Sequence, residues 1–190
     1  ALYYREVSSG FYAELPYLAA RCAINAVVQV PLVFVYSVIT YPMVGLRGGV
    51  FSGYFVFFFL VMFGLSLCGY AFSNLIAAIT PNQQSALNLY SALFQFCIFF
   101  CGYSIPVNQV PTYWSWATNF SFARWSFEAL VLNEMQGEPG DDDQDASYWL
   151  DYWSFSGHSK FSVFGVFVLQ VFVFHCLALL AMKFVSFQRT

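Results

Sequence analysis

Apolar residues fill this chain in long blocks, and charged residues stand at the edges of the blocks. Residues 48–123 contain no Asp, Glu, Lys, Arg or His and are rich in Phe, Leu, Val and Ile. The run is several times longer than the roughly 20 residues that cross a bilayer once as a helix. A soluble fold cannot bury so much continuous apolar surface, so the pattern predicts an all-α membrane protein.

Turn residues divide the apolar blocks into four expected membrane-spanning helices. Pro31 lies inside the first helix and is expected to kink it, and Thr80-Pro81-Asn82 ends the second. The four expected spans are residues 17–46, 51–76, 85–104 and 161–184. Four crossings place both ends of the segment on the same side of the membrane.

Two segments outside these spans are amphipathic. Residues 1–16 mix aromatic and charged side chains, which is typical of an interfacial helix lying along the membrane surface. Residues 106–159 form a long loop whose first half is rich in Trp, Tyr and Phe, side chains that favour the headgroup level. We expect re-entrant or interfacial helices in this first half and a solvated acidic tip at 138–145.

Composition narrows the function classes but leaves the orientation open. Hydrophobic residues make up 59% of the chain and charged residues 9%, and a net charge of −3 offers no basic surface for nucleic acid. Lys and Arg are nearly balanced between the two sides, so they do not decide which side is cytosolic. The five cysteines follow no metal-binding or disulfide pattern, and we expect no metal site.

Short motifs occur in a defined order over nearly the whole chain. They are Arg5-Glu6, Ser9-Gly10-x-Tyr12, Pro16-Tyr17, Pro31, Tyr41-x-Met43-x-Gly45-Leu46, Phe100-x-Gly102, Trp114-x-Trp116 and Ala129-Leu130-x-x-Asn133-Glu134. In these motifs and their spacing the chain resembles the membrane domain of ATP-binding cassette transporters of the G subfamily, the white-pigment and pleiotropic-drug-resistance type.

The resemblance implies an architecture and an assembly. The four spans would be the third to sixth of a six-helix exporter domain with cytosolic ends, and residues 106–159 would be its large external loop with re-entrant helices. Residues 1–16 would form the coupling helix that receives closure of the nucleotide-binding domain. Its expected contact residues are Arg5, Glu6, Ser9, Gly10 and Tyr12. A second transporter half, in a homodimer, a heterodimer or a fused chain, would complete a substrate cavity on the common axis.

The nucleotide-binding domain of such transporters is absent from these residues. The sequence has neither a GxxxxGK[ST] phosphate loop nor a Leu-Ser-Gly-Gly-Gln signature. We therefore expect no cofactor and no catalysis in this segment, with ATP and Mg²⁺ held by a domain encoded elsewhere. His158 and His175 form no base-plus-orienter arrangement in the sequence, so a membrane enzyme is disfavoured.

Polar residues inside the third expected span mark a candidate substrate face. Asn88, Ser91, Gln95 and Ile98 follow spacings of three, four and three, which places them on one helical face. Because an unpartnered polar group is costly in hydrocarbon, this face points to protein or to a wet cavity. Two interpretations stay open. By the resemblance, Ser91, Gln95 and Ile98 contact substrate; alternatively, the polar side chains bond to a neighbouring helix.

The residues that follow this face form a candidate gate. Tyr103 and Ser104 come directly after Gly102, where some drug-exporting members of the family carry two leucines that close the cavity. Neither residue here is leucine. If a gate exists at this level, Tyr103 is the better candidate to close it.

The external loop carries its own candidate residues. Arg124 and Glu128 stand four residues apart and are expected to pair on one helical face. Asn133 and Glu134 match the family motif at the outer mouth. For these residues we favour a structural role in fixing the loop over substrate contact.

The sequence predicts the membrane part of an ATP-driven exporter of a hydrophobic or amphipathic substrate, such as a lipid, sterol or xenobiotic. The 24 Phe and 13 Tyr suit such cargo, and they suit contact with lipid equally well. The expected location is the plasma membrane. The alternative is a nucleotide-independent channel or carrier. This alternative would be favoured if no phosphate loop were found upstream of this segment or in any co-encoded subunit.

Overall fold

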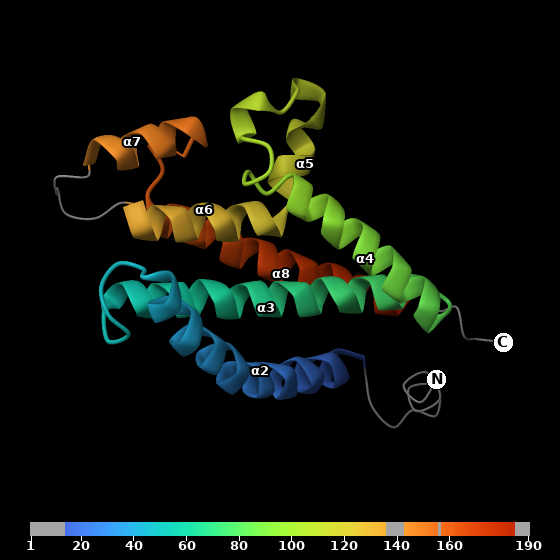
Figure 1. Cartoon of the computed structure of the whole chain (residues 1–190). Coiled ribbons are helices and arrows are strands. Elements are labelled where there is room, and N and C mark those ends of the chain that lie inside the picture. Colours follow the sequence, from blue (N-terminus) through green and yellow to red (C-terminus); the bar gives the residue numbers. More distant parts are fainter. Residues whose placement is uncertain (1–13, 136–142, 156, 185–190) are drawn as a thin grey trace.

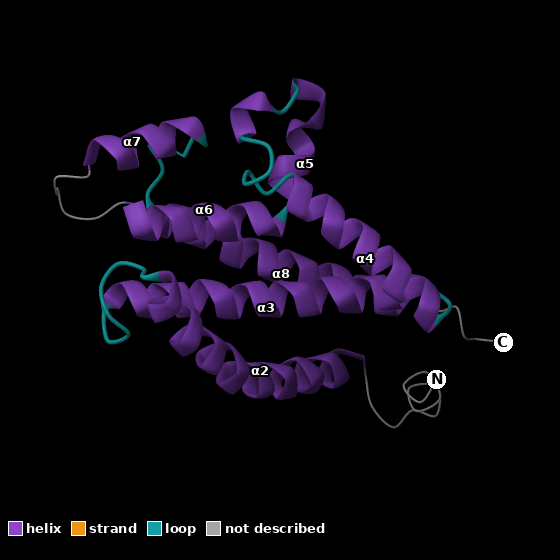
Figure 2. Cartoon of the chain, in the orientation of Figure 1, coloured by secondary structure: helices purple, strands orange, loops and turns teal. Residues whose placement is uncertain are grey.

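The computed structural model describes residues 14–135, 143–155 and 157–184 (Figure 1). Within these ranges the protein is mostly helical and contains no strand (Figure 2). The long helices are α2 (Glu14–Val44), α3 (Gly53–Ile79), α4 (Gln83–Phe99) and α8 (Lys160–Phe184). Between α4 and α8 lie the short turns η1 (Val107–Gln109) and η2 (Thr112–Trp114), followed by α5 (Ser115–Phe120), α6 (Phe122–Met135) and α7 (Asp143–Tyr152).

α2 contains two prolines and changes direction partway along its length (Figure 1). Pro31 and Pro42 have no backbone N–H to donate, and a proline ring crowds the preceding turn, so bending is the expected result. The helix ends at Val44 because Gly45 adopts a φ of +72°, a left-handed conformation that glycine tolerates. Residues 14–16, predicted as part of a surface helix, are instead the first residues of α2.

Three of the described helices are long and apolar enough to cross a membrane, namely α3, α8 and most of α2. The remaining expected span, residues 85–104, is shorter than predicted. α4 has 17 residues and ends at Phe99, whereas the sequence predicts a helix as far as residue 104. The prediction fails at its end because Gly102 adopts a φ of +92°, and the chain bends over residues 101–105.

α3 is the central helix and packs against α8, α2, α6 and α4. Phe72 of α3, Phe122 of α6 and Phe174 of α8 form an aromatic cluster with ring centroids 5.5 to 6.2 Å apart. These three side chains are buried. Val61 of α3 and Leu132 of α6 are also buried and belong to a second apolar cluster. The core therefore lies along α3, which contacts each of the other long helices.

α3 and α8 approach each other closely at Gly64. A Cβ atom added at Gly64 would lie 2.7 Å from Cε1 of Phe167, whose ring is fully buried. Small residues permit such close approach between helices in a membrane. Gly64 is therefore required by packing and not by an unusual backbone conformation.

The segment predicted as an external loop contains a buried helix. α6 packs lengthwise against α8 and α3 (Figure 1), and Ala129 and Leu132 are fully buried. α7 begins at Asp143, inside the stretch predicted as a solvated tip. Trp153 and Phe155, which follow α7, pack against the cluster that contains α6. The apolar side chains of this segment thus hold it against the helical core.

Candidate functional site

A cavity of about 1110 Å³ lies between α2, α3, α4 and α6. Most of its lining is apolar, and a few hydroxyl and amide groups are spread over it. The polar side chains in the lining are those of Gln29, Tyr36, Ser66, Tyr70, Ser73, Gln83, Tyr90 and Ser126. A large apolar cavity with a few polar groups is suited to a hydrophobic or amphipathic ligand.

α4 turns one face to this cavity and another to the outside of the molecule. Its lining residues are Gln83, Ala86, Leu87, Tyr90, Phe94 and Ile98. Asn88, Ser91 and Gln95 are exposed on the other face. Of the predicted substrate residues on this helix, the structure thus places Ile98 in the cavity lining, and Ser91 and Gln95 outside it.

The exposed polar residues of α4 make local hydrogen bonds. Ser91 Oγ donates to the carbonyl oxygen of Leu87 at 2.9 Å, and Gln84 Nε2 donates to Asn88 Oδ1 at 3.2 Å. Both contacts stay within α4. The packing interpretation of this face expects bonds to a neighbouring helix, and neither of these two bonds joins α4 to another described helix.

The candidate gate lies just beyond α4. The side chain of Tyr103 is 71% exposed, and its ring lies edge-on to Phe127 of α6 with centroids 6.0 Å apart. Ser104 is also exposed. Neither residue is part of the cavity lining, although Cys101 is. A gating role for Tyr103 stays a prediction.

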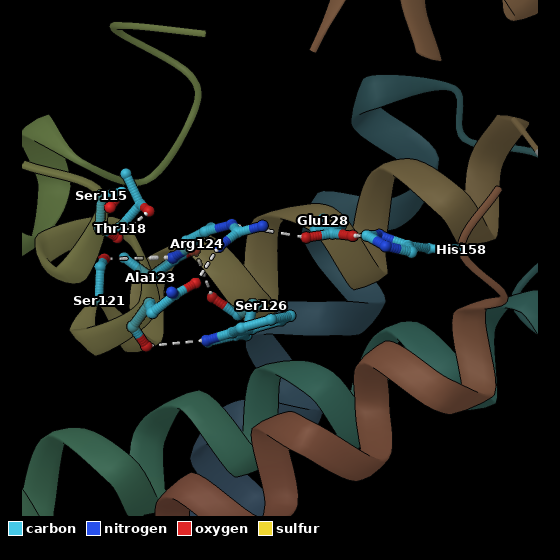
Figure 3. A network of polar contacts seen from close by, with 10 residues as sticks. Ser115, Thr118, Ser121, Ala123, Arg124, Ser126, Glu128 and His158 are labelled. Carbon is cyan, nitrogen blue, oxygen red and sulfur yellow. Dashed lines mark hydrogen bonds and ion pairs between the residues drawn. The ribbon is translucent and has the colours of Figure 1, made fainter. Parts of the chain in front are cut away.

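A network of polar contacts runs from α5 along α6 to the connection before α8 (Figure 3). Arg124 Nη1 donates to Asn119 Oδ1 at 2.7 Å, and the guanidinium lies 4.5 Å from the ring centroid of Trp125. Arg124 Nε is 3.7 Å from Glu128 Oε2. On its other side, Glu128 Oε1 lies 2.6 Å from Nδ1 of His158. One carboxylate therefore faces two basic groups.

Both charged residues of α6 are removed from solvent. The side chain of Glu128 is 0% exposed and that of Arg124 is 9% exposed. Burial lowers the pKa of the Arg124 guanidinium, and the neighbouring Glu128 carboxylate acts in the opposite direction. A buried charge that loses its partner is strongly destabilising. The network therefore favours one position of α6 relative to the connection before α8.

The pair of Arg124 and Glu128 is the one that their spacing predicts. The interpretation that His158 has no orienting acidic partner is wrong, because Glu128 occupies that position from 30 residues away in the sequence. Helical spacing cannot reveal a partner on another element, and no local pattern around His158 points to it. Neither Glu128 nor His158 lines the cavity.

The far end of α6 is tied to the connection between α2 and α3. The backbone N–H of Arg47 donates to Glu134 Oε1 at 2.6 Å, and Asn133 Nδ2 donates to the carbonyl oxygen of Tyr54 at 3.1 Å. The hydroxyl of Tyr41 donates to the carbonyl oxygen of Arg47. Asn133 and Glu134 thus join elements that are far apart in the sequence.

The predicted coupling residues Arg5, Glu6, Ser9, Gly10 and Tyr12 lie outside the described residues. Their role in contacting a nucleotide-binding domain stays a prediction.

Comparison with known proteins gives one consistent result. Residues 1–135 match the family described as ABC-2 type transporter. The chain is 28% identical to ABC transporter G family member 42 of Oryza sativa subsp. japonica over 98% of its length, and 27% identical to Pleiotropic drug resistance protein 1 of Nicotiana tabacum over 99%. It is 26% identical over 73% of its length to ABC transporter G family member 6 of Arabidopsis thaliana. The chain spans only 13%, 13% and 19% of these relatives.

Proposed function

Because this chain belongs to the ABC-2 type transporter family, with relatives in the G family of ABC transporters, we propose that it is the membrane part of an ATP-driven exporter. Its cargo in this proposal is a hydrophobic or amphipathic molecule such as a lipid, sterol or xenobiotic. The observation that supports this cargo is the large, mostly apolar cavity between α2, α3, α4 and α6, with its few hydroxyl and amide groups.

In this proposal α2, α3, α4 and α8 are the third to sixth spans of a six-helix domain, and a second half lies against the exposed face of α4. Ser91 and Gln95 then face the common axis of the two halves. Their exposure in the single chain supports this arrangement, since polar side chains in a bilayer are expected to face protein or water. Tyr103 and Ser104 lie at the outer end of the same path.

The energy source in this proposal is a nucleotide-binding domain that binds ATP and Mg²⁺ and belongs to the same protein. Its closure reaches the membrane helices through residues 1–16, where Arg5, Glu6, Ser9, Gly10 and Tyr12 make the contact. The length of the relatives supports a further domain, because the chain matches only 13% of G family member 42. The proposed location is the plasma membrane.

The decisive experiment uses the intact protein in proteoliposomes, with ATP hydrolysis and substrate efflux measured on the same sample. Glu6→Arg reverses a charge in the coupling segment, and we expect hydrolysis to continue while efflux falls at least about tenfold. Asp151→Arg makes the same charge reversal at an exposed position of α7 and serves as the matched control, with both activities unchanged.

Two results would contradict the proposal. Efflux that proceeds equally without nucleotide supports the alternative, a nucleotide-independent channel or carrier. Normal coupled transport by the Glu6→Arg variant contradicts the assignment of residues 1–16 to the coupling helix.

A further inference from the structure

The contact between Glu128 and His158 joins a buried group to one that reaches solvent. The Glu128 side chain is 0% exposed on α6, whereas the His158 side chain is 50% exposed in the connection between α7 and α8. This connection turns sharply, with a φ of +61° at Ser154 and +90° at Gly157. The backbone N–H of His158 also donates to the carbonyl oxygen of Phe155 at 3.4 Å, and the Phe155 side chain is fully buried.

We propose that Glu128 and His158 form a proton-sensitive latch that holds α6 to the connection before α8. An imidazole changes its charge between about pH 5 and pH 8. Protonation of the imidazole adds a Coulomb attraction between opposite charges to a hydrogen bond that a neutral imidazole can also donate. The latch is therefore tighter when His158 is protonated, and it weakens as the pH rises and the imidazole loses its charge.

The other charged groups around the latch lie on α6, α7 and α8. Arg124 shares the Glu128 carboxylate from within α6. At the start of α8, the Lys160 ammonium lies 5.2 to 5.6 Å from the centroids of three aromatic rings. Asp151 is exposed on α7. Reference carboxylate, ammonium and guanidinium groups ionise outside the range from pH 6 to pH 8, and the His158→Gln variant tests whether the response belongs to the imidazole.

The latch acts on a helix that forms one wall of the cavity. α6 contributes Phe122, Ala123, Ser126, Phe127 and Leu130 to the lining. Glu128 lies on the same helix but outside the cavity lining, and its carboxylate contacts His158. A proton taken up from the aqueous side at His158 therefore stabilises the position of that wall, without any contact between the imidazole and the cavity.

The experiment measures hydrogen–deuterium exchange of the α6 peptide in the intact protein, at pH 6 and pH 8, after correction for the intrinsic exchange rate. We expect exchange to be about fivefold slower at pH 6 than at pH 8, because the imidazolium adds a Coulomb attraction to the hydrogen bond. His158→Gln keeps a polar side chain of similar reach but cannot titrate, and its exchange is expected to be the same at both pH values. His158→Lys stays charged and is expected to exchange slowly at both.

The chain offers a matched control in its other histidine. His175 Nδ1 lies 2.9 Å from the carbonyl oxygen of Val171 within α8, so His175→Gln is expected to leave the pH dependence of α6 unchanged. The latch is overturned if the wild-type α6 shows no pH dependence. It is also overturned if the dependence survives in His158→Gln, or if it disappears equally in His175→Gln.

Discussion

α6 and α4 both carry polar residues in an apolar chain, but the surroundings of these residues are opposite. In α6, Glu128 and Asn133 are buried and bond to residues on other elements. In α4, Ser91 and Gln95 are exposed, and Ser91 bonds to a carbonyl of its own helix. The difference teaches that polar groups in α6 fix the position of a helix, whereas those in α4 remain available to another molecule.

The largest expected effect comes from breaking the network of α6. Glu128→Ala leaves Arg124 buried without its carboxylate, and we expect the protein to lose about 3 to 5 kcal/mol of stability. Thermal unfolding of the purified protein in detergent, or the yield of folded protein, measures the loss. Asp151→Ala removes a carboxylate that is exposed on α7 and is the control. Equal stability of the two variants would show that the buried network does not fix α6.

A second change tests the packing of the two helices that support α6. Gly64→Val places side-chain atoms against the buried ring of Phe167, and overpacking of this kind costs about 1 to 3 kcal/mol. Gly165→Ala is the control, because no atom outside the adjoining backbone of its own helix and its two chain neighbours lies within 4 Å of the added Cβ, and we expect no loss of stability. Denaturation curves of the two variants make the comparison. A tolerated valine would mean that α3 and α8 are less tightly packed than the structure indicates.

A smaller effect is expected where α8 meets the segment before α6. Gln170 Nε2 donates to the carbonyl oxygen of Phe120 at 2.6 Å. Gln170→Leu removes this bond, and we expect a loss of about 1 kcal/mol in unfolding experiments. Ser162→Ala, at an exposed position of the same helix, provides the reference. An unchanged unfolding curve for Gln170→Leu would mean that this hydrogen bond does not stabilise the region. The network around Glu128 would then be what holds α6 in place.

The smallest effect on stability is expected on α4. Ser91→Ala and Gln95→Leu alter exposed side chains, so their stability is expected to stay within about 0.5 kcal/mol of wild type. Under the proposed function, efflux of substrate nevertheless changes severalfold, because these side chains face the transport path. Ser85→Ala, exposed at the start of α4, is the control for both measurements. A loss of stability as large as that of Glu128→Ala would remove the contrast between the two helices.

The sequence predicts what depends on local pattern. The apolar blocks locate α2, α3, α4 and α8 to within a few residues at most ends, because burial in a bilayer demands long apolar helices. The pairing of Arg124 with Glu128 also follows from spacing on one helix.

What the sequence does not predict depends on contacts between distant elements. His158 meets Glu128, and Arg47 meets Glu134 across 87 residues, and no periodicity connects such positions. The early end of α4 depends on the conformation of Gly102, which is packed against the ring of Phe155. The division of α4 into a cavity face and an exposed face depends on where α2 and α3 lie, and this appears only in three dimensions.

The shortness of α4 has a consequence for the surrounding lipid. Its 17 residues rise only about 26 Å at 1.5 Å per residue, whereas α3 and α8 have 27 and 25 residues. A hydrophobic stretch shorter than the hydrocarbon layer is accommodated by local thinning of the bilayer, by snorkelling of flanking residues or by association with another protein surface. Under the proposed function α4 also crosses the bilayer, and we therefore expect the second half that lies against its exposed face to shield this short helix from the full thickness of the lipid.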